Sequence, residues 1–196
     1  MASQPASLHS YTYREYLAHD EASSTKHEYF RKEIYAMAGG TPLHAALSSA
    51  VGAALSAEVE GSPRRTYSSD LRVRVLASDL ATYPDLTIVC GELETDPESA
   101  VTVTNPAVLV EVLSESTEAY DRGEKLEQYK SIASAHTIVI VAQSERLIEV
   151  WSRSGEGIWS RTEAREGETA ELPRLPGSLD VQRLYDAAGA PSASAG

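Results

Sequence analysis

Three short apolar runs constrain the fold of this chain more than any other feature of its sequence. They span residues 86–90 (LTIVC), 107–113 (AVLVEVL) and 137–142 (TIVIVA). Each run is rich in β-branched side chains, which favour strands. Because a strand exposed on one face alternates apolar and polar residues, unbroken apolar runs of this length are typical of strands covered on both faces. We therefore expect a central β-sheet with helices on either side.

The expected helices lie before and after these strands. The longest covers residues 42–59, where Thr41 can cap the first turn, Pro42 suits the first helical position, and leucine or valine recurs every four residues. Residues 13–19 follow a capping-box pattern, and residues 121–132 also predict a helix. The small residues of the long helix allow it to pack closely on the sheet.

Other segments carry weaker strand patterns. Residues 28–37 suggest an extended hairpin, and residues 67–76 alternate so that Asp70, Arg72 and Arg74 share one face. Residues 147–152 and 158–162 are expected to form a sheet edge, and residues 181–185 a closing segment. The order of the elements predicts an α/β fold, a mixed β-sheet flanked by helices.

The length of 196 residues suits one domain, which we expect over residues 11–186. The two ends, residues 1–10 and 187–196, are small, polar and aperiodic, and are expected to be disordered. The single cysteine, Cys90, allows no internal disulfide and no cysteine-based zinc site, and it is expected to be buried. No run is long and apolar enough to cross a membrane and no secretory pattern is visible, so the expected compartment is the cytoplasm.

Two carboxylates occur in parts of the predicted sheet that have little access to solvent. Glu111 interrupts an otherwise apolar strand, and Asp85 follows Pro84 at the start of the preceding strand. An ionised carboxylate in apolar surroundings is costly unless it is paired, protonated or bound to a metal ion. Ligands often bind at strand ends, where a sheet opens to solvent. Two carboxylates that converge there suit a hard divalent cation, Mg²⁺ or Mn²⁺, whose remaining ligands are water and phosphate oxygens.

A lysine completes this pattern. Lys125 begins the predicted helix after the Glu111 strand, and its ammonium group can position a water nucleophile or offset phosphate charge. Each residue also has a structural explanation: Glu111 can pair with a core arginine, Asp85 can cap a turn, and Lys125 can lie on a solvated helix face. The order of the three along the chain carries more information than any one of them.

The net charge of −12 opposes a nucleic-acid substrate. Proteins that bind nucleic acid through many phosphates usually carry a basic surface. A local basic groove is compatible with an acidic total, and metal ions can neutralise phosphates at the site. Tight, sequence-independent binding is not expected.

The segments that carry these residues resemble the bacterial Uma family of restriction-endonuclease-like domains, once described as domain of unknown function 820, in the PD-(D/E)xK nuclease superfamily. The resemblance runs from about Tyr11 to Tyr185 and includes YPDLTIVCG and NPAVLVEVLSESTEAYDRGEKLEQYKSI. Its most specific stretch is EVLSESTEAYDRGEKLEQY. The resemblance implies a restriction-endonuclease-like fold, and it implies a homodimer because many nucleases of this fold pair to cut two strands.

The resemblance also implies roles for individual residues. Asp85 is the aspartate of the "PD" pair, Glu111 is the acid of the second half-motif, and Lys125 is a relocated lysine. The sequence departs from the superfamily pattern at Leu113, where a lysine is expected two residues after the acid. Leucine cannot perform this chemistry, so the role passes to the lysine of the next helix.

Three further residues are candidate neighbours of the pocket. The resemblance points to Glu28, before the long helix, and to His44, at its start. A histidine at a helix start is also common as a cap or a satisfied polar contact. Asp70 is a similar candidate, for which an ion pair with a neighbouring arginine is the alternative.

Functions of different classes follow from these observations. The leading hypothesis is a magnesium-dependent endonuclease that hydrolyses the phosphodiester bonds of DNA, with Asp85 and Glu111 as metal ligands. The alternative is a catalytically weak or inactive relative that binds a protein or nucleic-acid partner, which the acidic charge favours. A structural dimer with an incidental acidic pocket is the third, and failure to bind a divalent ion would support it.

Overall fold

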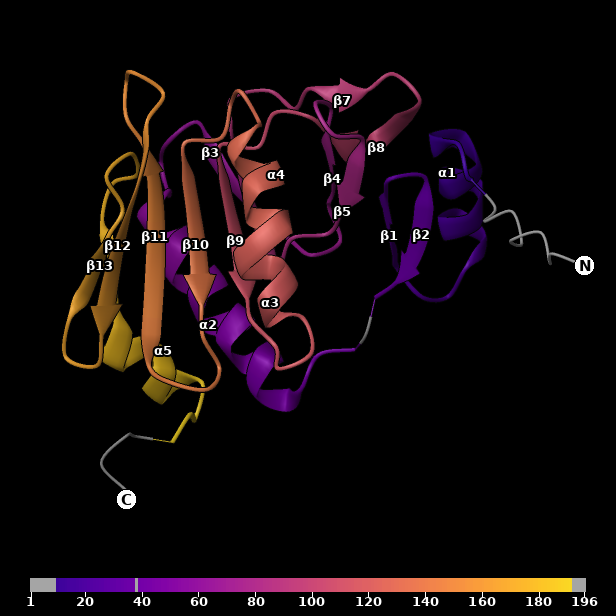
Figure 1. The fold of residues 1–196 in the computed structure, drawn as a ribbon. Helices are drawn as coiled ribbons and strands as arrows, with labels where there is room; N and C mark the ends of the chain where they lie inside the picture. Colours follow the sequence, from indigo (N-terminus) through magenta and orange to yellow (C-terminus); the bar gives the residue numbers. More distant parts are fainter. Residues whose placement is uncertain (1–9, 38, 192–196) are drawn as a thin grey trace, which may run out of the picture.

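The computed structural model describes residues 10–37 and 39–191, which form two mixed β-sheets, a two-stranded ribbon and flanking helices (Figure 1). The strands of the main sheet are β3 (Arg64–Ser68), β6 (Leu86–Cys90), β9 (Val108–Val112), β10 (Thr137–Val141), β11 (Leu147–Arg153) and β12 (Trp159–Arg165). Those of the N-terminal sheet are β1 (His27–Phe30), β2 (Glu33–Ala36), β4 (Arg72–Val75), β5 (Leu80–Thr82), β7 (Thr95–Asp96) and β8 (Ser99–Val103). The ribbon pairs β13 (Thr169–Glu171) with β14 (Ser178–Asp180).

The helices are α1 (Tyr13–Ala22), α2 (Pro42–Glu58), α3 (Glu118–Tyr120), α4 (Leu126–Lys130) and α5 (Val181–Ala187), with a π-helical turn at Asp121–Lys125 between α3 and α4. The main sheet runs β12-β11-β10-β9-β6-β3, and the N-terminal sheet runs β2-β1-β5-β4-β8-β7. In the main sheet β9 and β10 are parallel, whereas β6 is antiparallel to β9. The predicted mixed α/β architecture is confirmed.

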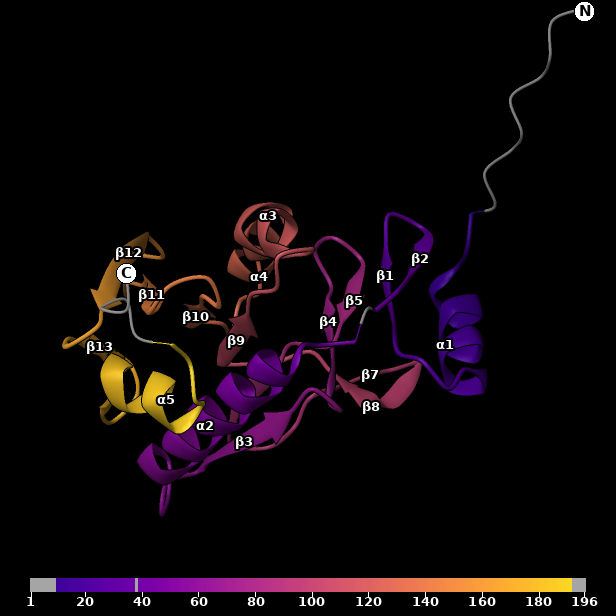
Figure 2. The ribbon, with the colours of Figure 1, turned by 90° about the horizontal axis from the view of Figure 1, so that it is seen from below.

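Helices cover both faces of the main sheet, as the unbroken apolar strands predict. Figure 2 shows α3 and α4 on one side of β9 and β10, and α2 and α5 on the other. Alternate residues of β9, Val108 and Val110, lie in one buried cluster with Leu47 and Leu55 of α2. The intervening Leu109 lies in a second cluster, with residues of α4. Because of this alternation, Glu111, the polar residue of β9, lies on the same side of the sheet as Leu109.

Two of the three predicted helix starts, those of α1 and α2, are confirmed by their capping contacts. The Thr41 hydroxyl accepts a hydrogen bond from the backbone N–H of His44 at 3.0 Å, and Pro42 occupies the first turn of α2. At α1, Thr12 and Glu15 form the reciprocal bonds of a capping box, and the helix continues to Ala22. Because its cap is fixed, α2 holds His44 in a defined position in its first turn.

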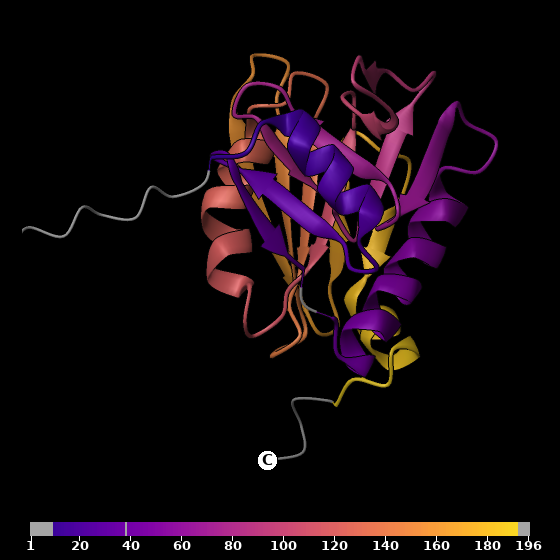
Figure 3. The same ribbon diagram turned by 90° about the vertical axis from the view of Figure 1, so that its right-hand side faces the viewer.

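The predicted N-terminal hairpin is confirmed as β1 and β2. Arg31 and Lys32 connect the strands with φ values of 50° and 65°, the left-handed pair of a type I′ turn. Figure 3 shows this hairpin and α1 in front of the main sheet, with α4 and α2 on opposite sides. β1 also pairs with β5, which joins the hairpin to the rest of the N-terminal sheet.

The prediction of one strand over residues 67–76 is wrong. The chain turns after Ser68, where the Leu71 N–H donates to the Ser68 carbonyl, and β4 then continues in the other sheet. The Ser-Ser-Asp sequence at 68–70 favours this turn because short polar side chains bond the nearby backbone. Asp70 therefore does not share a strand face with the two arginines of β4.

The expected closing segment, residues 181–185, lies in helix α5, because the Asp180 carboxylate accepts from the Arg183 N–H and caps the helix. One smaller expectation is wrong. Cys90 is exposed rather than buried, since it is the last residue of β6 and lies beyond the covered part of the sheet.

The expected disordered ends lie largely outside the described residues, which exclude 1–9 and 192–196. Within the described part of the tail, Arg146 donates hydrogen bonds to the carbonyls of Ala190 and Pro191. No helix among residues 10–37 and 39–191 is long and apolar enough to span a membrane.

Candidate active site

The residues predicted for the site come together in one pocket, with the exception of Asp70. The pocket has a volume of about 330 Å³ and lies where the N-terminal sheet, the main sheet and α2 meet. Its walls include the five remaining candidates, which come from five different segments of the chain: Glu28, His44, Asp85, Glu111 and Lys125. Only the tertiary fold brings them together.

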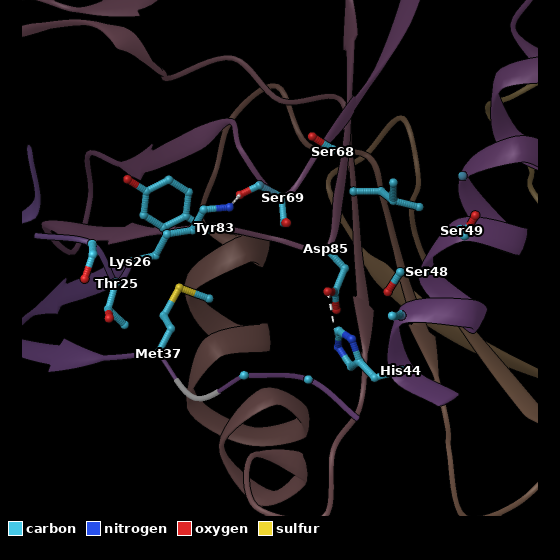
Figure 4. A pocket seen from close by; sticks show the side chains of 16 residues that line it. Thr25, Lys26, Met37, His44, Ser48, Ser49, Ser68, Ser69, Tyr83 and Asp85 are labelled. Carbon is cyan, nitrogen blue, oxygen red and sulfur yellow. Dashed lines mark hydrogen bonds and ion pairs between the residues drawn. The ribbon is translucent and has the colours of Figure 1, made fainter. Parts of the chain in front are cut away.

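Asp85 lies immediately before β6, and donors on both sides fix its carboxylate. Oδ2 accepts a hydrogen bond from the Val112 backbone N–H at 2.7 Å, and Oδ1 lies 3.2 Å from His44 Nε2. Figure 4 shows the His44 ring and the Asp85 carboxylate facing each other. The hydrogen bond to Asp85 raises the pKa of His44, although burial opposes the shift. His44 thus makes the polar contact that a helix-start histidine offers, and it orients Asp85.

Glu111 lies on the α4 side of β9, as the alternation of the strand requires. Its Oε1 accepts from the Tyr129 hydroxyl and lies 3.0 Å from Lys125 Nζ. The Glu111 side chain is only 6% exposed. Burial raises the pKa of Glu111 to about 8, although the Lys125 ammonium opposes that rise. The buried partner is a lysine and not the core arginine that the sequence left open.

Lys125 is buried, which excludes the solvated helix face considered from the sequence. Its side chain is 5% exposed, and Nζ lies 3.0 Å from Glu111, 3.1 Å from Glu28 and 3.5 Å from Asp121. Burial lowers the pKa of Lys125, but Glu111 and the other carboxylates raise it, and the net result lies well above the ordinary lysine value. The ammonium group therefore keeps its proton.

A π-helical turn carries both Asp121 and Lys125 into the pocket. The sequence predicts an ordinary helix over 121–132, whereas residues Asp121–Lys125 form a π-helix and α4 begins at Leu126. Short π-helical segments are frequent at functional sites. Sequence reasoning missed Asp121 and Tyr129 as partners, although their spacing of four residues on either side of Lys125 places them along one helix face.

The donor set is compatible with a hard divalent cation. Asp85 and Glu111 offer carboxylate oxygens to the same pocket, and among the described residues the bonds to Glu111 go to Oε1, which leaves Oε2 available. No group of three or more His, Cys, Asp or Glu side chains in the described chain is arranged as a metal cage. Mg²⁺ does not need such a cage, because one or two carboxylates suffice when water and phosphate complete its shell.

Asp70 lies outside this pocket. It follows Ser69 in the turn after β3, its side chain is 84% exposed, and its carboxylate pairs with Lys26 Nζ at 2.6 Å. The alternative of an ion pair is therefore correct for Asp70, but its partner is Lys26 rather than Arg72 or Arg74.

Comparisons with known proteins agree with this fold. Residues 13–182 match the Uma2 family model, described as "Putative restriction endonuclease". Two curated relatives from Synechocystis sp. are uncharacterized proteins: slr1290, 31% identical over 87% of this chain and 89% of its own length, and sll1609, 29% identical over 82% and 90%. A crystal structure described as a putative nuclease belonging to DUF820, from Anabaena variabilis, superposes with a TM-score of 0.68 and 14% identity over 85% of this chain and 93% of its own. That likeness shows a shared fold.

Proposed function

The chain belongs to the Uma2 family, and we propose that it is a metal-dependent endonuclease that hydrolyses the phosphodiester bonds of DNA. One observation carries the proposal: Asp85, Glu111 and Lys125, from three segments distant in sequence, line a single pocket. A pair of acids beside a lysine matches the chemical needs of phosphodiester hydrolysis, which are cation binding, water activation and charge stabilisation.

Asp85 and Glu111 would hold the metal ion, with Mg²⁺ or Mn²⁺ as the expected cation. When bound, such an ion supplies Lewis-acid stabilisation of the negative charge that develops on the phosphate. His44 and the Val112 N–H hold the Asp85 carboxylate in place through its two oxygens. The Asp85 carboxylate is therefore already ordered before a metal ion binds, which lowers the entropic cost of metal binding.

Lys125 is proposed to act in two ways. Its ammonium lies 3.0 Å from Glu111 Oε1 and favours the ionised form of that carboxylate, which is the form that binds a cation. Its positive charge at the pocket wall also offsets part of the charge of a phosphate. The superfamily pattern expects a lysine at the position of Leu113, which here lies in the apolar cluster beside α4. Lys125 can take over the role of that lysine.

Metal titration with matched variants tests the proposal. Calorimetry should show Mn²⁺ and Mg²⁺ binding to the wild type and none to the Asp85→Asn/Glu111→Gln double variant. Asp70→Asn is the control, because it removes an exposed carboxylate outside the pocket and should bind metal normally. Metal-dependent cleavage of labelled DNA should follow the same pattern. Wild-type protein that binds no divalent ion would exclude the proposed mechanism.

One observation favours the second candidate function, an inactive relative that acts as a binding module. Lys125 faces three carboxylates at 3.5 Å or less, so its charge is already compensated within the fold. A protein of this kind would bind a partner without metal-dependent cleavage, and the calorimetry and cleavage assays together separate the two functions.

We propose a homodimer as the form that cuts a duplex. Two active sites related by a two-fold axis can cut both strands in one binding event, whereas cleavage of one strand needs a single site. Sedimentation velocity at micromolar protein concentration measures which state is present.

A further inference from the structure

A second, larger cavity adjoins the candidate active site. Its volume is about 650 Å³, within the range of roughly 300–1,000 Å³ typical of pockets that hold organic ligands. Figure 4 shows Ser48 and Ser49 of α2 on one side of it, and Lys26, Tyr83 and Met37 on the other. None of the functional roles assigned above uses this space.

The two cavities share part of their lining. Both are lined by His44 and Asp85, and both also include Tyr83 and Met37. A phosphate bound between Asp85 and Glu111 would lie in the smaller cavity, and the larger cavity begins on the other side of Asp85 and His44. A chain of nucleotides that leaves the active site past Asp85 would place its next residue in or over the larger cavity.

The lining of the larger cavity combines apolar surface with hydroxyl groups, and its acidic and basic side chains are Lys26, His44 and Asp85. It is rich in hydroxyl groups, which suit sugar and base edges, and the Ser48 Oγ is buried without a hydrogen-bond partner among the described residues. A buried hydroxyl without a partner costs free energy that a bound ligand can recover. The ring of Tyr83 is not free for stacking, because Lys26 Nζ lies 5.3 Å from its centroid.

The charges around both cavities disfavour a tightly held duplex. The lysines that line them are Lys26, which pairs with Asp70, and Lys125, which pairs with Glu111. The net charge of the chain is −12. Proteins that hold duplex DNA strongly usually neutralise many phosphates, roughly 6–10 in well-studied cases. A substrate that enters a concave pocket with few phosphate contacts fits these charges better.

We infer that the larger cavity receives one unpaired nucleotide next to the scissile phosphate, so that the preferred substrate is a single-stranded or locally unpaired nucleic-acid strand. This inference rests on the proposed function, because it takes the phosphate position from the Asp85 and Glu111 pocket. Hydroxyl groups of α2 would contact the sugar or base of that nucleotide, and Ser48 gains a partner.

The inference predicts how the binding of nucleic acid depends on salt concentration. For single strands, log K falls with log salt concentration by about 0.7 for each phosphate neutralised. With two lysines at the cavities, the slope should not exceed roughly 1.4 in magnitude, whereas a duplex binder with 6–10 contacts should give roughly 5–9. The two values are far enough apart to be separated by one titration.

The experiment measures binding apart from cleavage. Fluorescence anisotropy would compare labelled oligothymidylate, oligouridylate and a DNA duplex on protein with Asp85 and Glu111 intact, with Ca²⁺ in place of Mg²⁺ so that the acidic pocket holds a cation, and a denaturing gel verifies that no strand is cut. Ser49→Leu fills the cavity from an exposed position of α2, and Ser56→Leu places the same residue two turns further along that helix, outside both cavities. Ser48→Ala removes the buried hydroxyl. Circular dichroism confirms that the variants fold.

The expected result is tighter binding of a single strand than of the duplex. Ser49→Leu should weaken it at least about tenfold through steric conflict and Ser48→Ala about fivefold through one lost hydrogen bond, with Ser56→Leu unchanged. The oligothymidylate and oligouridylate arms show whether the strand is DNA or RNA. Equal or tighter duplex binding, no single-strand binding, or no effect of Ser49→Leu would overturn the inference. Wild-type cleavage and metal binding are measured separately, so failure of the proposed function is seen independently.

Discussion

Replacement of Lys125 by methionine is expected to lower the free energy of unfolding by about 3–5 kcal/mol at pH 8. Methionine keeps the length of the side chain but removes the ammonium group, whose Nζ lies 3.0 Å from Glu111 Oε1 and 3.1 Å from Glu28 Oε1. The Glu111 side chain is 6% exposed, so little water can take the place of the cation. The cost arises because one partner of a buried ion pair remains without its counter-charge.

The loss should become smaller as the pH falls. Burial raises the pKa of Glu111 to about 8 while the Lys125 ammonium opposes the rise, so removal of the ammonium raises that pKa further. A carboxyl group whose pKa is raised by folding stabilises the fold below its unfolded pKa, and this contribution is lost as the pH rises through the folded value. Relative to the wild type, Lys125→Met should therefore regain stability between pH 8 and pH 6.

Urea unfolding at both pH values, followed by tryptophan fluorescence, measures the effect. Lys26→Met is the matched control, because Lys26 pairs with Asp70 at 2.6 Å while the two side chains are 39% and 84% exposed. An exposed pair of this kind contributes about 1 kcal/mol or less. Equal losses in the two variants, or a Lys125→Met loss that grows as the pH falls, would refute the reasoning.

Two further predictions concern polar groups away from the active site. Asp20→Asn should cost about 3–5 kcal/mol in urea unfolding, since Asp20 Oδ2 pairs with the buried Arg72 Nη2 at 2.7 Å and also accepts from the Tyr83 hydroxyl. Burial, together with Arg174, lowers the pKa of His136 to about 4, so the unfolded chain takes up the proton more readily and stability falls as the pH drops from 6.5 towards 4. A shift from 6.5 to about 4 corresponds to roughly 2.6 kcal/mol at pH 4.5. Because the His136 side chain is partly exposed, the expected loss is on the order of 1–2 kcal/mol, and a His136→Gln variant should lack this component.

The parts of the fold that sequence reasoning predicted correctly are those with strong periodic patterns. The apolar runs at β6, β9 and β10 indicate burial on both faces, and the structure places α2 and α5 on one face and α4 on the other. Local signals were sufficient for the start of α2, where Thr41 and Pro42 act within one turn. Patterns of this kind can be read from sequence because each one depends on a single dominant interaction.

The errors occurred where tertiary structure changes the meaning of a local pattern. Residues 67–76 alternate as one strand would, but they belong to strands of two different sheets, which are separated by a turn at Ser69 and Asp70. At 181–185 the sequence predicted a closing segment without its structure, which is a helix stabilised by the Asp180 cap and by the packing of Val181, Leu184 and Tyr185 in one cluster.

The candidate site shows the same division between chemistry and geometry. The sequence singled out Asp85, Glu111 and Lys125 by their chemistry, but the compensation of Lys125 by three carboxylates depends on how β1, β9 and the π-helical turn meet. Four carboxylates, with those of Glu28 and Asp121 included, face Lys125 and His44, so negative charge remains in excess even when both basic groups are protonated.

That excess negative charge can be neutralised in two ways. Burial, with Asp121 and Asp85 nearby, raises the pKa of Glu111 to about 8, so a proton is one solution. A divalent cation is the other, because it neutralises the same oxygens without protonating them. In the proposed function, the unfavourable burial of Glu111 in the free protein is therefore what gives the site its affinity for a cation. Lys125 cannot supply that affinity, and its own proximity limits how tightly the cation is held.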